Sequence, residues 1–277
     1  MKRVRQMNIS RRSLLRGIGL IGLSTTVLPV IDKISGLDSK AVAGGTKNSG
    51  KEKLTKQWVR IIDLKKCDGC EGLGMEPQCM AADRSVYHRL EGEEWIDVKK
   101  VHGEGDSTYW MPIPCMHCEN APCVKVCPVG ATYHSETGTV LVDNRKCIGC
   151  RFCLAACPYD RRFFYWEKRD ASPKDAFAEY SPEFPLPPRM GTANKCVLCE
   201  SFTKDGKLPA CIGGCPRGAM YFGDLETDVA TNGQEVVPLK KMLAEHNAYR
   251  YKEELGTKPR VYYLPGHGQE QGREPRE

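Results

Sequence analysis

The residues with the clearest capacity for chemistry are fifteen cysteines in a chain of 277 residues. An odd number of cysteines cannot all be paired in disulfides, so bound metal is the first alternative. They form four groups: Cys67, Cys70 and Cys79; Cys115, Cys118, Cys123 and Cys127; Cys147, Cys150, Cys153 and Cys157; and Cys196, Cys199, Cys211 and Cys215. Proline follows the last cysteine of the second, third and fourth groups, whereas the first group has Asp83 in place of a fourth cysteine.

The third group has the most specific spacing, C-x2-C-x2-C-x3-C-P, from Cys147 to Pro158. This spacing is typical of iron–sulfur proteins, in which three close thiolates hold one cubane cluster and the fourth thiolate reaches a neighbouring cluster. Structural zinc sites use two well-separated C-x2-C pairs instead, so the spacing disfavours zinc. The third group therefore predicts bound [4Fe-4S] clusters.

The elements that must position these cysteines are repeated along the chain. Two pairs of segments match in sequence: Asp63–Cys70 with Asp143–Cys150, and Cys127–Tyr133 with Cys215–Tyr221. The β-rich runs Trp58–Asp63 and Thr139–Asp143 lead into cysteine groups, and Glu136–Gly138 predicts a hairpin turn between residues 131–134 and 140–142. The pattern predicts an α+β fold of duplicated two-cluster ferredoxin-like modules with inserted loops.

From about Trp58 to Leu225 the chain resembles the four-cluster iron–sulfur subunits of respiratory oxidoreductases. This family is typified by the B subunits of DMSO and polysulfide reductases, and it includes the related exported subunit of the menaquinol-oxidising complexes of sulfate reducers. The motifs that carry the resemblance are Cys115-Met-His-Cys118-Glu-Asn-Ala-Pro122-Cys123, Cys150-Arg-Phe-Cys153, Ala156-Cys157-Pro-Tyr159 and Lys195-Cys196-x2-Cys199. The ending Lys258–Leu264 is similar as well.

The resemblance implies four clusters whose ligands are exchanged between groups, the first group with the fourth and the second with the third. Carried over, the ligand sets are Cys67, Cys70, Cys79 and Cys215; Cys115, Cys118, Cys123 and Cys157; Cys147, Cys150, Cys153 and Cys127; and Cys196, Cys199 and Cys211 with Asp83. Three sets predict [4Fe-4S] clusters. For the fourth, three alternatives stay open: Asp83 ligates a [4Fe-4S] cluster, the centre is [3Fe-4S], or Asp83 is a surface acid beside an open site.

Several other polar residues lie next to the cysteines. His117 stands between two expected ligands, and we expect it to form hydrogen bonds or to tune a potential rather than to bind iron. Basic residues beside the clusters can raise their potentials by stabilising the reduced form, although exposed, solvated charges are the default expectation. These residues are Arg151, Arg161, Arg162, Lys195 and Arg217.

The first 43 residues have the pattern of an export signal. Ser10, Arg11 and Arg12 precede an apolar stretch from Gly17 to about Ile31, and Ala41-Val42-Ala43 precedes Gly44. This arrangement predicts a twin-arginine signal peptide cleaved before Gly44. The alternative is an uncleaved membrane anchor, but an apolar run of about 15 residues is shorter than the roughly 20 that a spanning helix needs. The twin-arginine route exports folded proteins, which suits a cofactor inserted in the cytoplasm.

The sequence divides into a signal peptide (1–43), a linker (44–57), a four-cluster ferredoxin-like domain (58–225) and a C-terminal segment of helix, short strand and tail (226–277). Residues 236–254 predict the helix, 170–189 an inserted loop and 266–277 a disordered tail. Residues 1–43 hold eight of the 41 basic and two of the 35 acidic residues, so the remainder has equal numbers of each. This balance gives no argument for a nucleic-acid partner.

With 40% hydrophobic and 8% aromatic residues, the chain is expected to depend on clusters rather than on apolar burial for its folding. No motif for substrate chemistry is present, so no catalytic residues are predicted. We expect an electron relay at the outer face of the cytoplasmic membrane or in the periplasm, attached peripherally. Its expected partners are a quinone-reactive membrane subunit and a catalytic molybdopterin or cytochrome subunit. The rival hypothesis is a self-contained reductase that uses the cluster beside Asp83 as a Lewis acid.

Overall fold

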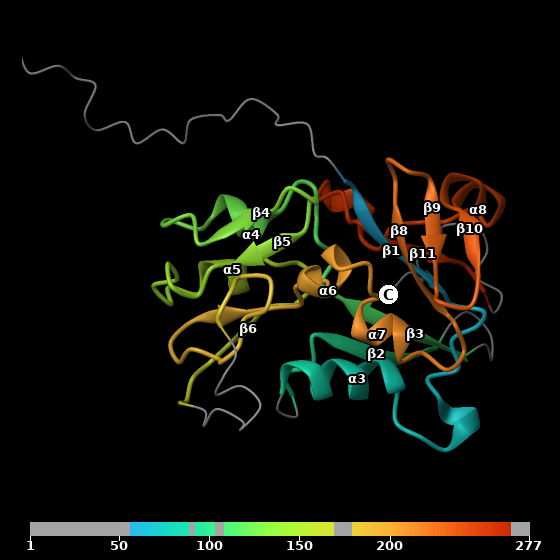
Figure 1. Cartoon of the computed structure of the whole chain (residues 1–277), viewed down its shortest axis with the longest axis horizontal. Coiled ribbons are helices and arrows are strands. Elements are labelled where there is room, and N and C mark those ends of the chain that lie inside the picture. The colour runs from blue at the N-terminus through green and yellow to red at the C-terminus, as the bar shows by residue number, and fades with distance from the viewer. Residues whose placement is uncertain (1–55, 89–91, 103–107, 169–178, 267–277) are drawn as a thin grey trace, which may run out of the picture. The chain divides into compact units, whose positions relative to one another are not determined.

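The computed structural model describes residues 56–88, 92–102, 108–168 and 179–266. The predicted signal peptide, the linker up to residue 55, residues 170–178 of the predicted insertion and the tail from 267 lie outside these residues. The described part combines short helices with one sheet of five strands and three sheets of two strands, in agreement with the predicted α+β class (Figure 1). None of the helices within these ranges has the length and apolar composition that a membrane span requires.

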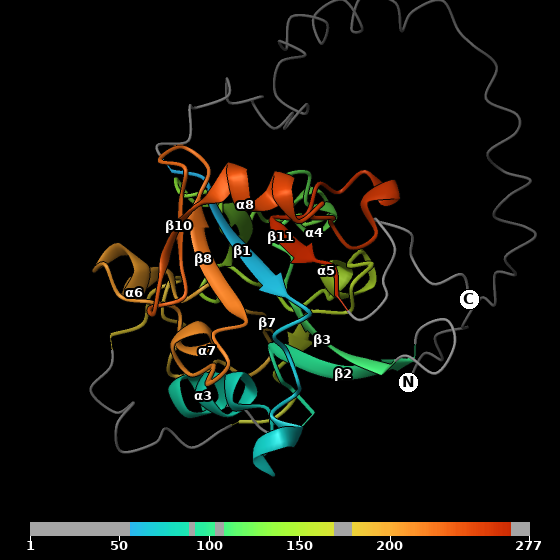
Figure 2. The ribbon, with the colours of Figure 1, turned by 90° about the vertical axis from the view of Figure 1, so that its right-hand side faces the viewer.

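The largest sheet has the strand order β10-β9-β8-β1-β11. Its strands are β1 (Trp58–Asp63), β8 (Met220–Asp224), β9 (Val229–Thr231), β10 (Val236–Pro238) and β11 (Val261–Leu264). Only the pairing of β1 with β11 is parallel, and Figure 2 shows β1 between β8 and β11. The segments at the two ends of the described chain therefore belong to one sheet, and the predicted strand at residues 58–63 is confirmed.

Side chains on the two faces of β1 enter different cores, because successive residues of a strand point to opposite sides of the sheet. Val59 and Ile61 pack with the helix α8 (Leu239–Glu245). Ile62 packs on the other face, in the core that contains several cysteines. Arg60 has the same parity as Ile62 and is only 2% exposed. The sheet is therefore covered by α8 on one face and by the cysteine-rich region on the other.

The smaller sheets are hairpins or short pairings. They comprise β2 (Ile96–His102) with β3 (Thr108–Pro114), β4 (Thr132–His134) with β5 (Val140–Val142), and β6 (Phe163–Phe164) with β7 (Ala193–Asn194). The β4–β5 pair confirms the predicted hairpin. Its turn is closed by an N–H···O bond of 3.0 Å from Gly138 to Ser135, and Gly138 adopts φ 79°, which glycine tolerates without strain.

Four helices contain a cysteine: α3 (Gln78–Tyr87), α4 (Pro122–Lys125), α5 (Phe152–Ala155) and α7 (Ala210–Gly213), of which all but α3 are single turns. The helix α6 (Glu200–Lys204) and the 3-10 turns η2 (Glu71–Leu73) and η3 (Glu253–Leu255) are equally short and contain none. Helix α3 lies beside α7, and α4 contacts α5 (Figure 1). Single helical turns are not stable in isolation, so their surroundings must hold them in place.

The C-terminal helix is shorter than predicted. Residues 236–238 form strand β10, and the helix occupies only Leu239–Glu245. Asn247 adopts φ 48° after the helix, and Tyr249 then pairs with Tyr263 through two backbone hydrogen bonds of 3.0 and 2.8 Å. The apolar spacing of this segment therefore comes from a strand, a short helix and a bridge in succession, and a continuous helix over 236–254 is wrong. In the described part of the predicted insertion, residues 179–189, the one regular pairing is the bridge between Ser181 and Phe184.

Candidate metal centres

All fifteen cysteines lie in the described part of the chain, and none of them forms a disulfide. Within that part, no three His, Cys, Asp or Glu side chains are close enough together to hold a single metal ion. Three hollows are instead each lined by four cysteines. In each hollow, three of the cysteines belong to one sequence group and the fourth belongs to another.

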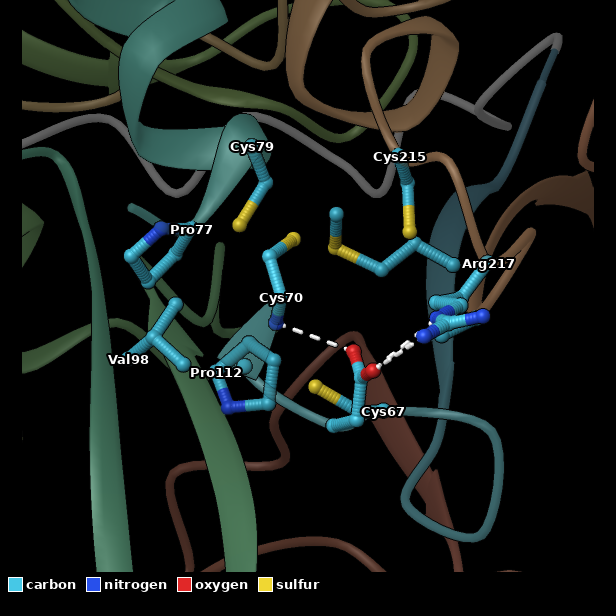
Figure 3. Close-up of a pocket in the computed structure, with 12 residues that line it drawn as sticks. Cys67, Cys70, Pro77, Cys79, Val98, Pro112, Cys215 and Arg217 are labelled. Carbon is cyan, nitrogen blue, oxygen red and sulfur yellow. Dashed lines mark hydrogen bonds and ion pairs between the residues drawn. The ribbon is translucent and has the colours of Figure 1, made fainter. Parts of the chain in front are cut away.

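The first site consists of Cys67, Cys70, Cys79 and Cys215. Figure 3 shows their sulfur atoms directed toward the space between them, from the loop after β1, from α3 and from the segment after α7. An ion pair borders this site, since Arg217 donates to Asp68 at 2.6 and 2.9 Å and Asp68 accepts the N–H of Cys70 at 2.9 Å. The loop between β1 and α3 is thereby fixed to the Cys-Pro segment of the fourth group.

The second and third sites are arranged in the same way. The second site consists of Cys115, Cys118, Cys123 and Cys157. The third site consists of Cys127, Cys147, Cys150 and Cys153. Among all the cysteines, Cys150 alone is exposed. The third site therefore has the most direct access to the surface.

The fourth site brings Asp83 to three cysteines of the last group. The charge of Asp83 contributes to the raised pKa of Cys196, Cys199 and Cys211, after the larger effect of burial. All three cysteines are buried, and Asp83 is itself only 5% exposed. Asp83 is therefore not a surface acid, and that alternative is wrong.

Helix α3 explains why Cys79 and Asp83 serve different sites. Cys79, Asp83 and Tyr87 are its three buried residues, spaced four apart on one face. Each step of four residues advances about 6 Å along the helix. Cys79 therefore reaches the first site, Asp83 the fourth, and the Tyr87 hydroxyl lies beside Cys199.

The three other C-x3 pairs also join neighbouring sites across one short helix. Helix α7 lies between the fourth and first sites, and α4 and α5 both lie between the second and third. The pairs are Cys211 with Cys215, Cys123 with Cys127, and Cys153 with Cys157. The spacing thus couples the first site to the fourth and the second to the third.

Backbone N–H groups point at several of the sulfur atoms. Four N–H···S hydrogen bonds of 3.4 to 3.5 Å reach Cys70, Cys147, Cys196 and Cys199. Left-handed residues in the cysteine loops, such as Gly69 (φ 60°) and Gly149 (φ 73°), curl the backbone around the sites. A Cβ at position 149 would clash with the carbonyl oxygen of Gly191. Hydrogen bonds to sulfur favour the thiolate form, which is the form that binds metal.

Burial opposes that ionisation. Burial raises the pKa of Cys67 and Cys199 to about 11 and that of Cys118 to about 12, and neighbouring cysteine charges add to the effect at Cys67 and Cys118. At neutral pH these thiols become thiolates only when a positive centre offsets their charge. Four such thiols around a hollow fit a multi-iron cluster, so the residues present are compatible with the implied cofactor.

The basic residues near the cysteines differ in exposure. Arg161, Arg162 and Lys195 are buried, contrary to the default expectation, whereas Arg151 and Arg217 are exposed as that expectation had it. Lys195 donates to the backbone carbonyls of Val140 and Cys196. These buried cations lie among the sites rather than on the protein surface.

His117 is buried between Cys115 and Cys118. Its Nδ1 atom accepts the N–H of Val140 at 3.1 Å. Burial, together with Lys195 and Arg60, lowers its pKa well below the usual range, so the imidazole is neutral at physiological pH. The expected hydrogen-bonding role of His117 is therefore confirmed.

The sequence interpretation missed Arg60. Its Nη2 atom donates to the sulfurs of Cys211 at 3.4 Å and Cys196 at 3.9 Å. The available signal was an arginine in the middle of the apolar strand Trp58–Asp63. In a strand with one solvated face, an arginine at such a position points to solvent and needs no special role. The structure shows instead that both faces of the sheet are covered, so that Arg60 is buried.

The four sites are neighbours in a fixed order. Three pairs of cysteines from different sites are close enough for the charge of one to contribute to raising the pKa of the other: Cys79 and Cys211, Cys196 and Cys115, and Cys153 and Cys123. The order is therefore first, fourth, second, third. The fourth site lies in the interior of this series, and the first and third sites lie at its ends.

Comparisons with known proteins identify iron–sulfur subunits as relatives of this chain. A family model described as a 4Fe-4S dicluster domain matches residues 107–175, which contain the second and third cysteine groups. The B subunit of selenate reductase from Mesobacillus selenatarsenatis is 37% identical over 75% of this chain and 72% of its own length. Protein NrfC of Escherichia coli is 32% identical over 94% of this chain and 96% of its own length. The iron-sulfur cluster-binding subunit of menaquinone reductase from Nitratidesulfovibrio vulgaris is 33% identical over 75% of this chain and 88% of its own length.

Proposed function

Since the chain belongs to the family of iron–sulfur electron-transfer subunits of respiratory oxidoreductase complexes, we propose that it relays single electrons through four clusters. The first, second and third sites each hold a [4Fe-4S] cluster with four thiolate ligands. The fourth holds either a [4Fe-4S] cluster with Asp83 as a ligand or a [3Fe-4S] cluster. The clusters supply the chemistry by taking up and releasing one electron each.

The observation that carries this proposal is the order of the four sites. The first, fourth and second sites adjoin one another through cysteines that share hydrophobic clusters. The three cysteines of the fourth site are all buried, whereas the third site has an exposed ligand, Cys150. The polypeptide encloses the fourth site, fixes the spacing of the sites through α3, α4, α5 and α7, and leaves the third site open to the surface. Such a series suits electron transfer from one protein surface to another.

We further propose that the relay consists of two duplicated modules. Strands β8 and β1 with helices α3 and α7 enclose the first and fourth sites, and β4 and β5 with α4 and α5 enclose the second and third. Equivalent hydrogen bonds support the duplication. Asp63 N–H donates to Ala219 at 2.7 Å, and Asp143 N–H donates to Ala131 at 2.8 Å. Both aspartates also accept a backbone N–H two residues later at 2.9 Å.

The third site is proposed to exchange electrons with a partner protein. Four apolar side chains that are more than half exposed belong to the segments around it: Ile148, Phe152, Trp166 and Met190. The segments that contain these side chains are in contact, since Arg151 lies over the Trp166 ring at 4.7 Å and Gly149 adjoins both Gly191 and Phe164. Exposed apolar groups clustered around an exposed ligand are typical of a protein interface.

The partners are proposed by analogy with the relatives. One relative is a subunit of a menaquinone reductase and another of a selenate reductase. We propose that this chain likewise connects a quinone-reactive membrane subunit with a catalytic molybdopterin or cytochrome subunit. The sequence of residues 1–43 supports delivery by the twin-arginine route to the outer face of the cytoplasmic membrane.

The rival hypothesis, a self-contained reductase at the Asp83 site, is less well supported. All four side chains of that site are less than a tenth exposed, so a substrate would have to enter the protein core. We expect the anaerobically purified chain to contain about fifteen or sixteen iron atoms and no zinc. With reduced methyl viologen it should accept electrons without sustained turnover of selenate or dimethyl sulfoxide. Continuous viologen oxidation with either compound would support the rival, and stoichiometric zinc would contradict the relay.

A further inference from the structure

The fourth site is the most enclosed of the four and has an unusual set of charges. Three thiolates and one carboxylate meet where every one of these side chains is buried. Several anions buried together are strongly destabilised unless cations or hydrogen-bond donors offset them. The identity of the nearest buried cation should therefore matter to any cofactor held there.

Arg60 provides that cation. It projects from the middle of β1 onto the cysteine-rich face of the sheet, and its Nη2 atom donates to both Cys211 and Cys196. Among the described residues, its Nε and Nη1 atoms have no hydrogen-bond partner although both are buried. Within the described part of the chain, no carboxylate forms an ion pair with Arg60. The positive charge of Arg60 is therefore not neutralised by an acidic side chain and acts on the thiolates.

Arg60 also lies toward the junction between the two halves of the series. Its charge contributes to lowering the pKa of His117, which belongs to the loop of the second site. Lys195, another buried cation of this region, donates to two backbone carbonyls rather than to the sulfurs. Among the described residues, Arg60 is therefore the cationic side chain that donates hydrogen bonds to the thiolates of the fourth site.

We propose that Arg60 is a positioning residue that raises the reduction potential of the fourth centre by hydrogen-bonding Cys196 and Cys211. The proposal rests on the relay proposed above. Reduction adds one negative charge to the centre, and a nearby cation in a poorly solvated core stabilises the reduced form more than the oxidised form. Hydrogen bonds to cluster sulfurs and the net local charge are established determinants of such potentials. Arg60 would thereby keep the electron transfer between the fourth and second sites from becoming strongly uphill.

The test is a redox titration of the loaded full-length chain followed by EPR. An Asp83→Cys variant first identifies the signal of the fourth centre, because only that signal should change. In Arg60→Gln, the ratio of reduced to oxidised fourth centre at a fixed ambient potential should fall about tenfold, which corresponds to a shift of about 59 mV for a one-electron couple. Arg60→Lys, which keeps the charge, should retain most of the wild-type potential.

Arg217→Gln is the matched control, because Arg217 is an exposed arginine beside the first site and is already paired with Asp68. It should leave the fourth centre unchanged. A fourth centre with full iron and wild-type potential in Arg60→Gln would overturn the proposal. If Arg60→Gln loses that iron, an iron-complete Arg60→Lys variant decides the matter, since a tenfold fall there would also overturn it. Failure of the relay itself is distinguishable, because wild-type protein would then lack the fourth centre.

Discussion

Asp83 lies one helical turn after Cys79, and the geometry of α3 sends these two side chains to different sites. A carboxylate is a harder ligand than a thiolate and binds iron less tightly in a sulfur-rich site. If Asp83 completes the fourth centre, that centre should be the one most prone to losing an iron atom. The effect of changing this residue should therefore appear in a site to which its sequence neighbours do not contribute.

We predict that Asp83→Cys makes the fourth centre resistant to oxidative iron loss and shifts its potential. The physical reason is that a fourth thiolate replaces the weaker ligand. Asp83→Ala should favour the three-iron form at the same centre and leave the other three intact. EPR spectra with iron counted per chain provide the measurement. Asp68→Asn, at an exposed acid beside the first site, is the control. Wild-type spectra and iron content in both Asp83 variants would show that Asp83 is not a ligand.

Individual residues show which parts of the site could be predicted from the sequence and which could not. The resemblance to the four-cluster family was sufficient to expect Cys79 and Asp83 in different sites. The helix α3 shows the physical reason, since a step of four residues advances about 6 Å along its axis. The role of Arg60 was not predictable, since nothing local shows that the second face of β1 is also covered. Burial of Arg162 and Lys195 was missed for the same reason, because exposure depends on contacts between distant segments.

The cysteine-bearing helices depend on the sites that they border. Helices α4, α5 and α7 have four residues each, which is too short for intrinsic stability. Their backbones are tied to the sites through cysteines at both ends of a turn. Cluster binding should therefore be coupled to the formation of these elements.

We predict that Cys150→Ser and Cys211→Ser each remove about one centre in four but differ in their effect on folding. Cys150 is exposed, so its loss should affect the third site and α5 locally. Cys211 is buried, and its loss would leave Arg60 in the core without one of its anionic partners. Soluble yield and iron content, measured together, should fall more steeply for Cys211→Ser. A monodisperse, fully folded protein without iron would contradict the dependence of folding on clusters.

Among the elements, those next to the cysteines were the most predictable. The strand at residues 58–63 and the hairpin closed at Gly138 follow from β-rich runs and a glycine turn. The C-terminal helix was overestimated because strand β10, helix α8 and the Tyr249–Tyr263 bridge are all apolar segments in succession. The parallel pairing of β11 with β1 joins residues about two hundred positions apart, and local patterns carry no information on such pairings.

At the scale of the whole molecule, the two ends of the relay differ. The first site is bordered by the Arg217–Asp68 ion pair, and Leu73 and Met75 are exposed in the adjoining segment. The third site is bordered by the more apolar surface around Trp166. Two chemically different ends suit the two different partners proposed above.

We predict that residues 1–43 direct export of the folded protein with its clusters already bound. Replacing Arg11 and Arg12 with Lys should retain cluster-containing precursor in the cytoplasm, because the paired arginines identify folded cargo for the twin-arginine route. Replacing Lys2 and Arg3, outside the arginine pair, is the control and should have little effect. Cell fractionation with iron analysis of both fractions provides the measurement. Export of the Arg11 and Arg12 variant by the route for unfolded chains would contradict this interpretation.

The proposed relay consists of four one-electron centres in the order first, fourth, second, third. The most direct measurement is an EPR-monitored reductive titration of the anaerobically purified chain, with wild type compared with Asp83→Cys. We expect four separately titrating centres, magnetic coupling between neighbours, and an Asp83-sensitive signal that is coupled to two other centres because its site is interior. Three or fewer centres, or an Asp83-sensitive signal coupled to only one neighbour, would contradict it.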